Sequence, residues 1–244
     1  MKVKEYLKNK LNQGAVHITL IDPSRQLPEV AGRLARTAQE VGSDLVLIGS
    51  VSPTGQRVLM ETVEAVRNRA TIPVIFLPTG SESISLNLDA LLFLSMLNSR
   101  NADFITSTHA RIAPVLKKLG VETIPVGFIL VEPGMKIGEL AEADLVTRDN
   151  FWQAIGYALT AEYMGMDYVY LEAGSGAAQP VPAGMIRAVK RELSIPLIVG
   201  GGIRTAIDAR RVRQAGADIV VTGTVIENAG YRERLRSILS ALKE

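Results

Sequence analysis

Glycines and hydroxyl-bearing residues follow three apolar stretches in the C-terminal half of the chain, where they could bind an anion. The three segments read YLEAGSG at 170–176, VGGGIR at 199–204 and TGT at 222–224. Glycine turns let backbone N–H groups approach an oxyanion closely, and a helix that starts after such a turn adds its positive end. Tight turns made only for packing would explain any one segment. The order of the three favours a ligand that carries a phosphate group.

Two carboxylates stand next to positions of this kind and could take part in chemistry. Glu172 lies inside the first glycine segment, where it could accept a proton from a substrate hydroxyl within hydrogen-bond reach. Asp22 ends the run HITLI and could offer oxygen to Mg²⁺, although a lone aspartate before proline is also a common turn residue. A hydroxyl at Ser50 could complete a metal site with Asp22, or it could cap a helix.

The elements that must position these residues are short apolar runs rich in β-branched side chains. Most runs are continuous rather than alternating, which is typical of strands buried on both faces of a parallel sheet. The predicted strands are 16–21, 45–48, 73–77, 90–94, 123–131, 168–171, 196–199 and 218–222. Each candidate residue above comes at or just after the end of one of these strands.

Apolar residues at helical spacing fill most of the gaps between the strands. The predicted helices are 3–11, 27–41, 58–66, 112–119, 151–164, 185–193, 206–214 and 231–242. Strands that alternate with helices in a chain of 244 residues predict an α/β fold, the (β/α)₈ TIM barrel, since a doubly wound sheet usually has fewer strands. No linker or charge block divides the chain, so we expect one domain over 1–244, with its active site at the carboxyl ends of the strands.

The gap between the third and fourth predicted strands is unusually short. Residues 78–89 are rich in serine and too few for a full crossover helix. We therefore expect a modified barrel whose third helix is missing or vestigial. The segment is either a short helix or an opening in the outer ring that leaves a groove for a long ligand.

Composition excludes several classes of function. The 27 Lys and Arg against 25 Asp and Glu leave a net charge of only +2, too small to favour nucleic-acid binding. The absence of cysteine excludes disulfides, thiolate nucleophiles, and zinc–thiolate or iron–sulfur sites. The chain shows neither a signal peptide nor the roughly 20 apolar residues of a transmembrane helix, so we expect a cytoplasmic protein.

The remaining candidates have structural interpretations. The two histidines lack a third partner for a Ser-His-Asp triad or a zinc site. His17 lies inside the first strand, away from its carboxyl end, and is interpreted as structural, while His109 is expected to be solvated. Trp152 is expected in the core or at a subunit contact. Lys136 could meet a diphosphate, but a solvated loop lysine is the favoured interpretation.

Taken together, these segments resemble the geranylgeranylglyceryl phosphate synthases of archaea and their bacterial prenylglyceryl phosphate synthase relatives. The resemblance covers nearly the whole chain, through the segments 17–23, 48–50, 97–101, 131–134, 170–176, 199–204 and 222–224. It implies a prenyltransferase that joins a polyprenyl diphosphate, with geranylgeranyl as the expected chain, to the C3 hydroxyl of sn-glycerol 1-phosphate. This reaction forms the first ether bond of ether lipids and uses Mg²⁺. The resemblance also implies the loss of the third helix, a homo-oligomer (dimer or hexamer), and at most a transient membrane contact for the lipid product.

The resemblance assigns a role to individual residues. Asp22 and Ser50 would hold Mg²⁺ against the diphosphate. Glu172 would accept the proton of the attacking hydroxyl, and Tyr170 would help to orient the substrate. Glycerol phosphate would be bound by Tyr170, Leu171, Glu172, Ala173, Gly174, Ser175, Gly176, Gly201, Gly202, Gly223 and Thr224. The floor of the prenyl slot would come from among Leu91, Phe93, Met96 and Phe104.

The chain departs from this family on the diphosphate side. Some relatives carry a lysine where this chain has Leu20 and an acidic residue where it has Ser24. The second strand ends in IGSV, so Ser52 is an alternative to Ser50 as the hydroxyl ligand.

Two other functions stay open: a sugar-phosphate isomerase-type barrel enzyme, and a barrel that binds a phosphorylated ligand without catalysis. Against the first, no lysine lies within a predicted strand; against the second, both Asp22 and Glu172 are present.

Overall fold

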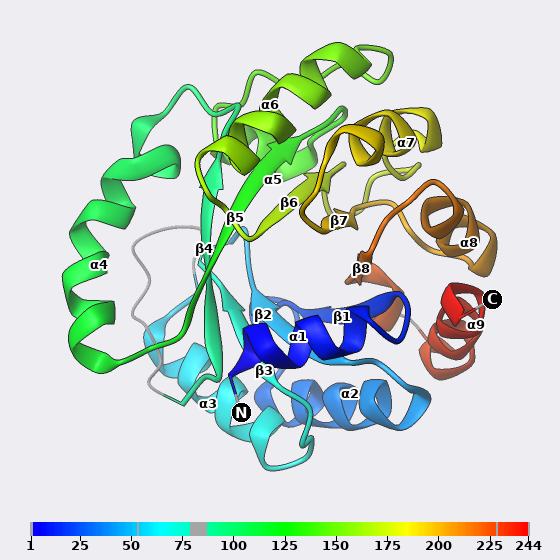
Figure 1. Ribbon diagram of the computed structural model, residues 1–244. Helices are drawn as coiled ribbons and strands as arrows, with labels where there is room; N and C mark the ends of the chain where they lie inside the picture. Colours follow the sequence, from blue (N-terminus) through cyan, green and yellow to red (C-terminus); the bar gives the residue numbers. More distant parts are fainter. Residues whose placement is uncertain (1, 53, 79–86, 228, 244) are drawn as a thin grey trace.

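A computed structural model describes residues 2–52, 54–78, 87–227 and 229–243, and its strands close into a parallel barrel in chain order. The strands are β1 (Val16–Ile21), β2 (Leu45–Gly49), β3 (Val74–Leu77), β4 (Ala90–Met96), β5 (Thr123–Leu130), β6 (Tyr168–Glu172), β7 (Leu197–Gly200) and β8 (Ile219–Thr222). Figure 1 looks into this barrel with its strands at the centre and helices around them. The predicted TIM barrel is confirmed, and every predicted strand is present.

Side chains alternate between the barrel interior and the layer beneath the helices, because successive residues of a strand point to opposite faces. Ile18, Leu47 and Val221 belong to the interior cluster. Val46 and Val220 belong to the outer cluster, against the helices. This alternation decides which residues near the strand ends can reach a central pocket.

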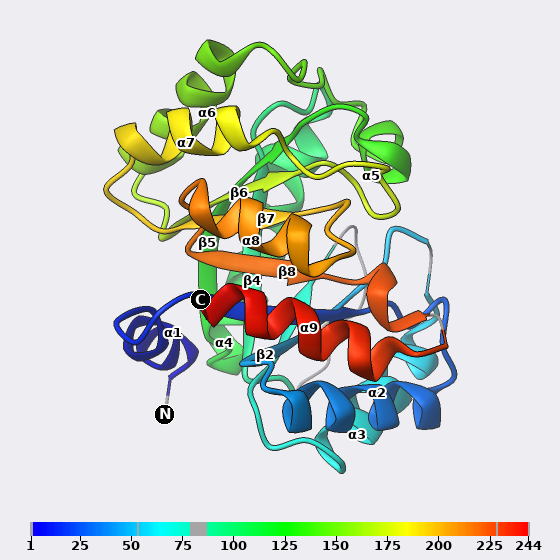
Figure 2. The ribbon, with the colours of Figure 1, turned by 90° about the vertical axis from the view of Figure 1, so that its right-hand side faces the viewer.

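Helices close one end of the barrel and surround its sides. The first helix, α1 (Val3–Leu11), buries Val3 and Leu7 against the interior cluster and crosses the amino-terminal end (Figure 1). The surrounding helices, seen from the side in Figure 2, are α2 (Pro28–Val41), α3 (Gln56–Arg67), α4 (Thr108–Leu119), α6 (Phe151–Tyr163), α7 (Ala183–Glu192), α8 (Ala206–Gln214) and α9 (Tyr231–Lys243). No helix of the described ranges is long and apolar enough to cross a membrane.

Three short helical elements were not predicted from the apolar pattern. They are a π-helix, η1 (Asp103–Ser107), the helix α5 (Met135–Leu140) and a 3₁₀ turn, η2 (Thr224–Glu227). Elements of one or two turns are too short for a periodic apolar face to show itself. The predicted absence of a third helix concerns residues 78–89, and most of these, 79–86, lie outside the described residues.

His17 ties the first strand to the last, which agrees with its interpretation as structural. Its Nδ1 lies 2.9 Å from Ser43 Oγ and its Nε2 lies 3.0 Å from Thr222 Oγ1. Burial lowers the pKa of His17 to about 4, so the ring is neutral at physiological pH. The contact therefore fixes the seam between β1 and β8.

Candidate active site

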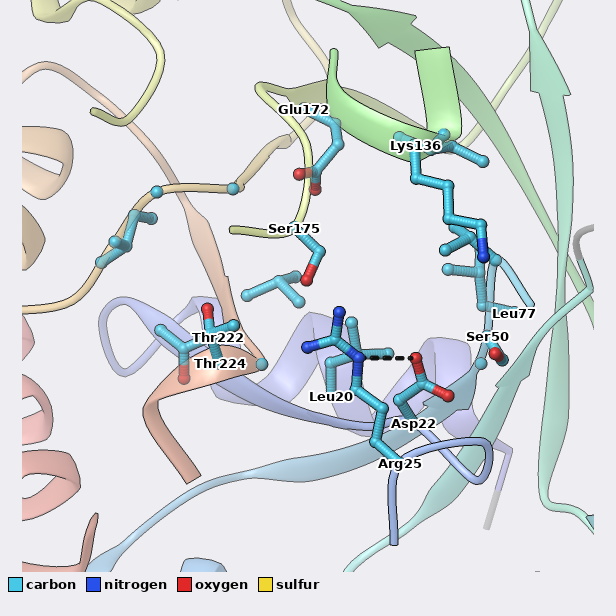
Figure 3. A pocket seen from close by; sticks show the side chains of 18 of the residues that line it. Leu20, Asp22, Arg25, Ser50, Leu77, Lys136, Glu172, Ser175, Thr222 and Thr224 are labelled. Carbon is cyan, nitrogen blue, oxygen red and sulfur yellow. Dashed lines mark ion pairs between the residues drawn. The ribbon is translucent and has the colours of Figure 1, made fainter. Parts of the chain in front are cut away.

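A pocket opens at the carboxyl ends of the barrel strands, as the fold class predicts. Figure 3 shows side chains from several strand ends around it. Its labelled lining residues are Leu20, Asp22, Arg25, Ser50, Leu77, Lys136, Glu172, Ser175, Thr222 and Thr224. The pocket therefore gathers segments that are more than 200 residues apart in the sequence, since Asp22 and Thr224 both line it.

Glu172 and Tyr170 stand side by side at the end of β6. Glu172 is 8% exposed, and its Oε1 accepts a hydrogen bond of 2.7 Å from the Gly174 N–H. The Tyr170 hydroxyl donates to the same carboxylate. Burial raises the pKa of Glu172 to about 7, against the opposing effect of these two hydrogen bonds. A carboxylate with this pKa can accept and release a proton near neutral pH.

Tyr170 is held so that it remains a hydrogen-bond donor. Its ring meets Phe128 edge to face, with centroids 4.8 Å apart. Burial and the charge of Glu172 both raise the pKa of Tyr170 well above its usual value of 10.0. The phenol therefore stays protonated, and its proton fixes the orientation of the neighbouring carboxylate.

The turn after β7 packs directly against Glu172 because it is made of glycine. A Cβ at Gly200 would collide with the Tyr170 hydroxyl and Glu172 Oε2. A Cβ at Gly201, whose φ is +78°, would meet Glu172 Oε1 and the Gly174 N–H. Gly200 was not among the predicted site residues; its only sequence signal is that it opens the triple glycine of VGGGIR.

Backbone N–H groups on this side of the pocket could bind a phosphate. Gly201, Gly202, Gly223 and Thr224, which the resemblance assigns to glycerol phosphate binding, all line the pocket. The nearby start of α8 already has its own cap, because the Thr205 side chain and Asp208 satisfy each other's backbone N–H groups. The N–H groups of Thr205 and Asp208 are therefore already engaged and would not bind an anion here.

In the predicted segment 170–176, some residues line the pocket and others hold the loop in place. Tyr170, Glu172 and Ser175 line the pocket. The side chains of Leu171 and Ala173 face the outer core, so only their backbone could serve a substrate. Gly174 donates to Glu172, and the Gly176 carbonyl accepts a 2.6 Å bond from Arg204 Nη2. These two glycines hold the loop in place.

Across the pocket, oxygen atoms from the loops after β1 and β2 form a hydrogen-bonded chain. Asp22 Oδ1 accepts from the Ser24 N–H at 2.9 Å and from Ser24 Oγ at 2.7 Å. Ser50 Oγ donates to Ser24 Oγ at 3.1 Å. Ser52 is directed elsewhere, because its hydroxyl accepts from Lys136 Nζ at 2.8 Å. The structure thus brings Ser50, rather than Ser52, toward Asp22.

These oxygens suit Mg²⁺ only in company with a substrate. Within the described ranges, no group of three or more His, Cys, Asp and Glu side chains could hold a metal. Mg²⁺ commonly takes one or two carboxylates and completes its octahedron with water and substrate phosphates. One carboxylate, Asp22, beside the hydroxyls of Ser24 and Ser50 fits that pattern.

Two cations border this oxygen chain: Arg25, which the sequence analysis did not mark, and Lys136, which it considered for a diphosphate but favoured as a solvated residue. Arg25 Nη1 lies 2.9 and 2.7 Å from the two carboxylate oxygens of Glu227, and Arg25 Nε lies 3.7 Å from Asp22 Oδ2. Lys136 is exposed, as expected, but it lies in the helix α5 rather than in a loop, and it lines the pocket. The sequence signal that could have marked Arg25 is its position three residues after Asp22.

A second cavity, of about 190 Å³, lies between β4 and α4. Its lining includes Leu91, Phe93, Met96 and Phe104, the four residues expected at the floor of a prenyl slot. Met96 also lines the first pocket. The expectation that His109 is solvated was wrong: it is half-buried in this cavity, and its Nε2–H donates to the Leu94 carbonyl at 2.7 Å.

Known proteins resemble the chain over almost its full length. The model of the PcrB family matches residues 6–242. A geranylgeranylglyceryl phosphate synthase of Pyrococcus horikoshii is 44% identical over 242 residues, which are 99% of this chain and 95% of the relative. One from Thermococcus kodakarensis is 45% identical over 241 residues, 99% of this chain and 96% of the relative.

Solved structures agree with the sequence relatives. The (S)-3-O-geranylgeranylglyceryl phosphate synthase of Thermoplasma acidophilum, solved with its substrate sn-glycerol-1-phosphate, superimposes with a TM-score of 0.97. It is 38% identical to this chain, and the match covers 100% of this chain and 99% of that one.

Proposed function

The chain belongs to the PcrB family, and from that premise we propose that it is a prenyltransferase which joins geranylgeranyl diphosphate to the C3 hydroxyl of sn-glycerol 1-phosphate. The observation that carries the chemistry is Glu172, a buried carboxylate whose pKa of about 7 suits a general base. It lies in one pocket with Asp22 and the glycine turns of β7 and β8.

The glycerol phosphate half of the reaction belongs to β6, β7 and β8. The backbone N–H groups at Gly201, Gly202 and Gly223 bind the phosphate, which brings the C3 hydroxyl toward Glu172. The hydroxyl oxygen attacks C1 of the prenyl chain as its proton passes to the Glu172 carboxylate. Tyr170 keeps that carboxylate oriented through its hydrogen bond.

The diphosphate half belongs to β1 and β2. As the new C–O bond forms, the bond from C1 to the diphosphate breaks, and its electron pair leaves with the diphosphate. Asp22 and Ser50 are the residues that would hold Mg²⁺ here, supported by Ser24, and Ser52 is the alternative hydroxyl. Bound at these oxygens, Mg²⁺ would offset the negative charge that develops on the leaving group.

The second cavity is the proposed site of the prenyl tail. Leu91, Phe93 and Phe104 give it apolar walls, and Met96 is common to both linings. Burial of an apolar chain contributes roughly 0.8 kcal/mol per methylene group, so a long tail would supply much of the substrate affinity. This binding would hold C1 near the glycerol hydroxyl.

Assembly into a homo-oligomer is proposed through the outer face of α6. Trp152 is 83% exposed and Tyr163 is 81% exposed, on a helix that is apolar on most sides. Exposed aromatic side chains of this size are enriched at protein interfaces. The core position considered for Trp152 is wrong, and the subunit contact stays a prediction, as do the number of subunits and the cytoplasmic location.

A two-substrate assay tests the proposed function. Labelled sn-glycerol 1-phosphate is incubated with geranylgeranyl diphosphate, with Mg²⁺ or with EDTA, and the label is followed into an organic-extractable product. The expected result is transfer that requires Mg²⁺, with sn-glycerol 3-phosphate as the stereochemical control. Absence of product with every prenyl length, despite a higher melting temperature with glycerol phosphate, would instead support a binding barrel.

A further inference from the structure

Lys136 spans the mouth of the pocket between two loops. It is the second residue of α5, which follows β5, and its Nζ donates to Ser52 Oγ after β2, at 2.8 Å. Figure 3 shows the side chain extended from the α5 side toward the loop that carries Ser50. The ammonium group therefore lies beside the oxygen chain of Asp22, Ser24 and Ser50, on the side away from the glycine turns.

The backbone that carries Lys136 is fixed against the loop of Glu172. The Gly134 N–H donates to the Val131 carbonyl at 3.0 Å and to the Ala173 carbonyl at 3.1 Å. Gly134 and Gly174 approach so closely that a Cβ at Gly174 would collide with the Gly134 carbonyl. Lys136 is thus anchored to the same structure that holds Glu172.

Met135, just before Lys136, adopts a φ of +51°, which non-glycine residues rarely do. Backbone conformations of this kind persist where the surrounding structure enforces them, often next to ligand sites. Here the unusual conformation occurs at Met135, directly before Lys136, whose side chain lines the pocket.

The two cations at the mouth of the pocket, Arg25 and Lys136, differ in whether a carboxylate already pairs with them. Arg25 is already engaged by Glu227 through two contacts of 2.7 and 2.9 Å. In the part of the chain that the structure describes, no carboxylate forms an ion pair with Lys136, and its recorded partner is the neutral hydroxyl of Ser52. An ammonium carries three N–H donors, so two can serve a ligand while Ser52 keeps the third.

We propose that Lys136 binds the diphosphate of the prenyl substrate and stays with it as it leaves as pyrophosphate. This assignment rests on the proposed function, and it deepens that function by naming a cation for the leaving group. Lys136 approaches the diphosphate from the β5 side while Asp22 and Ser50 approach it from the β1 and β2 side. A charge placed there stabilises the electron pair that the diphosphate takes from C1.

The test compares Lys136→Met with wild type in steady-state kinetics. Loss of a charge-assisted hydrogen bond should lower kcat/KM for the prenyl diphosphate by about 10-fold to 100-fold. The KM for glycerol phosphate should stay within about twofold, because that site is built by other loops. Lys136→Arg should recover most of the loss. Lys118→Met, on an exposed lysine near the end of α4, removes the same charge elsewhere and should behave as wild type.

Binding of inorganic pyrophosphate gives a readout that needs no turnover. Pyrophosphate should raise the melting temperature of wild type and Lys118→Met, and it should do so much less for Lys136→Met. Equal stabilisation of all three proteins, or unchanged kcat/KM in Lys136→Met, would overturn the assignment, as would a loss confined to glycerol phosphate. If wild type failed to transfer a prenyl group at all, the proposed function would fall, while the pyrophosphate measurement would still decide whether Lys136 binds this anion.

Discussion

On the side of β6 and β7 the pocket consists of buried groups and backbone, whereas on the side of β1 and β2 it consists of side chains that are partly or fully exposed. Glu172 has its hydrogen-bond partners, Tyr170 and Gly174, within its own strand and the loop that follows it. Among the residues that the structure describes, the Asp22 carboxylate has Ser24 and, at 3.7 Å, Arg25 as its partners. The groups of the first half satisfy one another, whereas the second half has few protein partners among the described residues, as the proposed metal and diphosphate site would require.

The two halves of the pocket differ in how they control charge. Burial makes the protein itself set the protonation of Glu172, because a charge out of water is costly. The cluster of Asp22, Ser24 and Ser50 is partly exposed to solvent, and it leaves room for the large negative charge of the proposed diphosphate. The proposed base is therefore prearranged, whereas the proposed leaving-group site would be assembled with its substrate.

The largest effect is expected from Glu172→Gln, which tests the buried half of the pocket. Loss of a general base should lower kcat by about 10²-fold to 10⁴-fold, with glycerol phosphate still bound. The wild-type rate should rise with pH through about 7, because Glu172 must be ionised to act, and the variant should lose this rise. Rates measured across pH with both substrates check the expectation. Near-normal turnover in the variant would remove Glu172 from the reaction.

Asp22→Asn tests the other half. Removal of the carboxylate should lower kcat/KM for the prenyl diphosphate by about 10²-fold to 10³-fold, since a bound metal supplies several kcal/mol of charge stabilisation. The KM for glycerol phosphate should not change. Kinetics with Mg²⁺ varied at fixed substrate check this, and an effect of equal size on both substrates would contradict the division into two halves.

Burial of Glu172 should also appear in stability. Its pKa rises from 4.5 to about 7 on folding, so the unfolded state releases the proton first and the free energy of unfolding falls as pH rises through that window. Glu172→Gln lacks this penalty and should be more stable than wild type above about pH 7, by a difference on the order of 3 kcal/mol. Denaturant unfolding at several pH values checks the expectation.

The exposed Glu64→Gln serves as the control for this stability measurement. If Glu172→Gln and wild type had equal stability at every pH, Glu172 would not be buried as described.

The smallest expected effect distinguishes the two hydroxyls. Ser50→Ala should raise the Mg²⁺ concentration needed for half-maximal rate by about tenfold, because its hydroxyl belongs to the chain that ends at Asp22. Ser52→Ala should leave that concentration unchanged, since Ser52 contacts Lys136. The two variants assayed side by side check this, and the reverse result would make Ser52 the ligand.

The sequence predicts the buried half of the pocket, at β6 and β7, better than the partly exposed half at β1 and β2. The strands β6, β7 and β8 carry continuous apolar runs, so burial on both faces shows directly in their composition. Glu172 and the glycines follow those runs immediately. The contribution of Gly200 depends on the distance to Tyr170, which no local pattern reveals.

In the partly exposed half, the sequence signal for the site residues is weaker, because their contacts join segments that are distant in the chain. Arg25 meets Glu227 across 202 positions of the chain, and Lys136 meets Ser52 across 84. The side chain of His109 is likewise turned inward by its contacts with Phe93 and Leu94 rather than by the pattern of its own helix. Local composition predicts neither kind of contact.

The seam between β1 and β8 has a consequence for how the protein acquires activity. His17 and Thr222 are 205 positions apart, so their contact closes almost the whole chain into a ring. Closing a loop of that length costs roughly 5 kcal/mol of chain entropy, which favours late formation of this pairing during folding. Asp22 and Thr224 lie on opposite sides of the same seam. Partly folded chains that already hold several βα units would therefore lack the pocket, and recovery of activity during refolding would report closure of the ring.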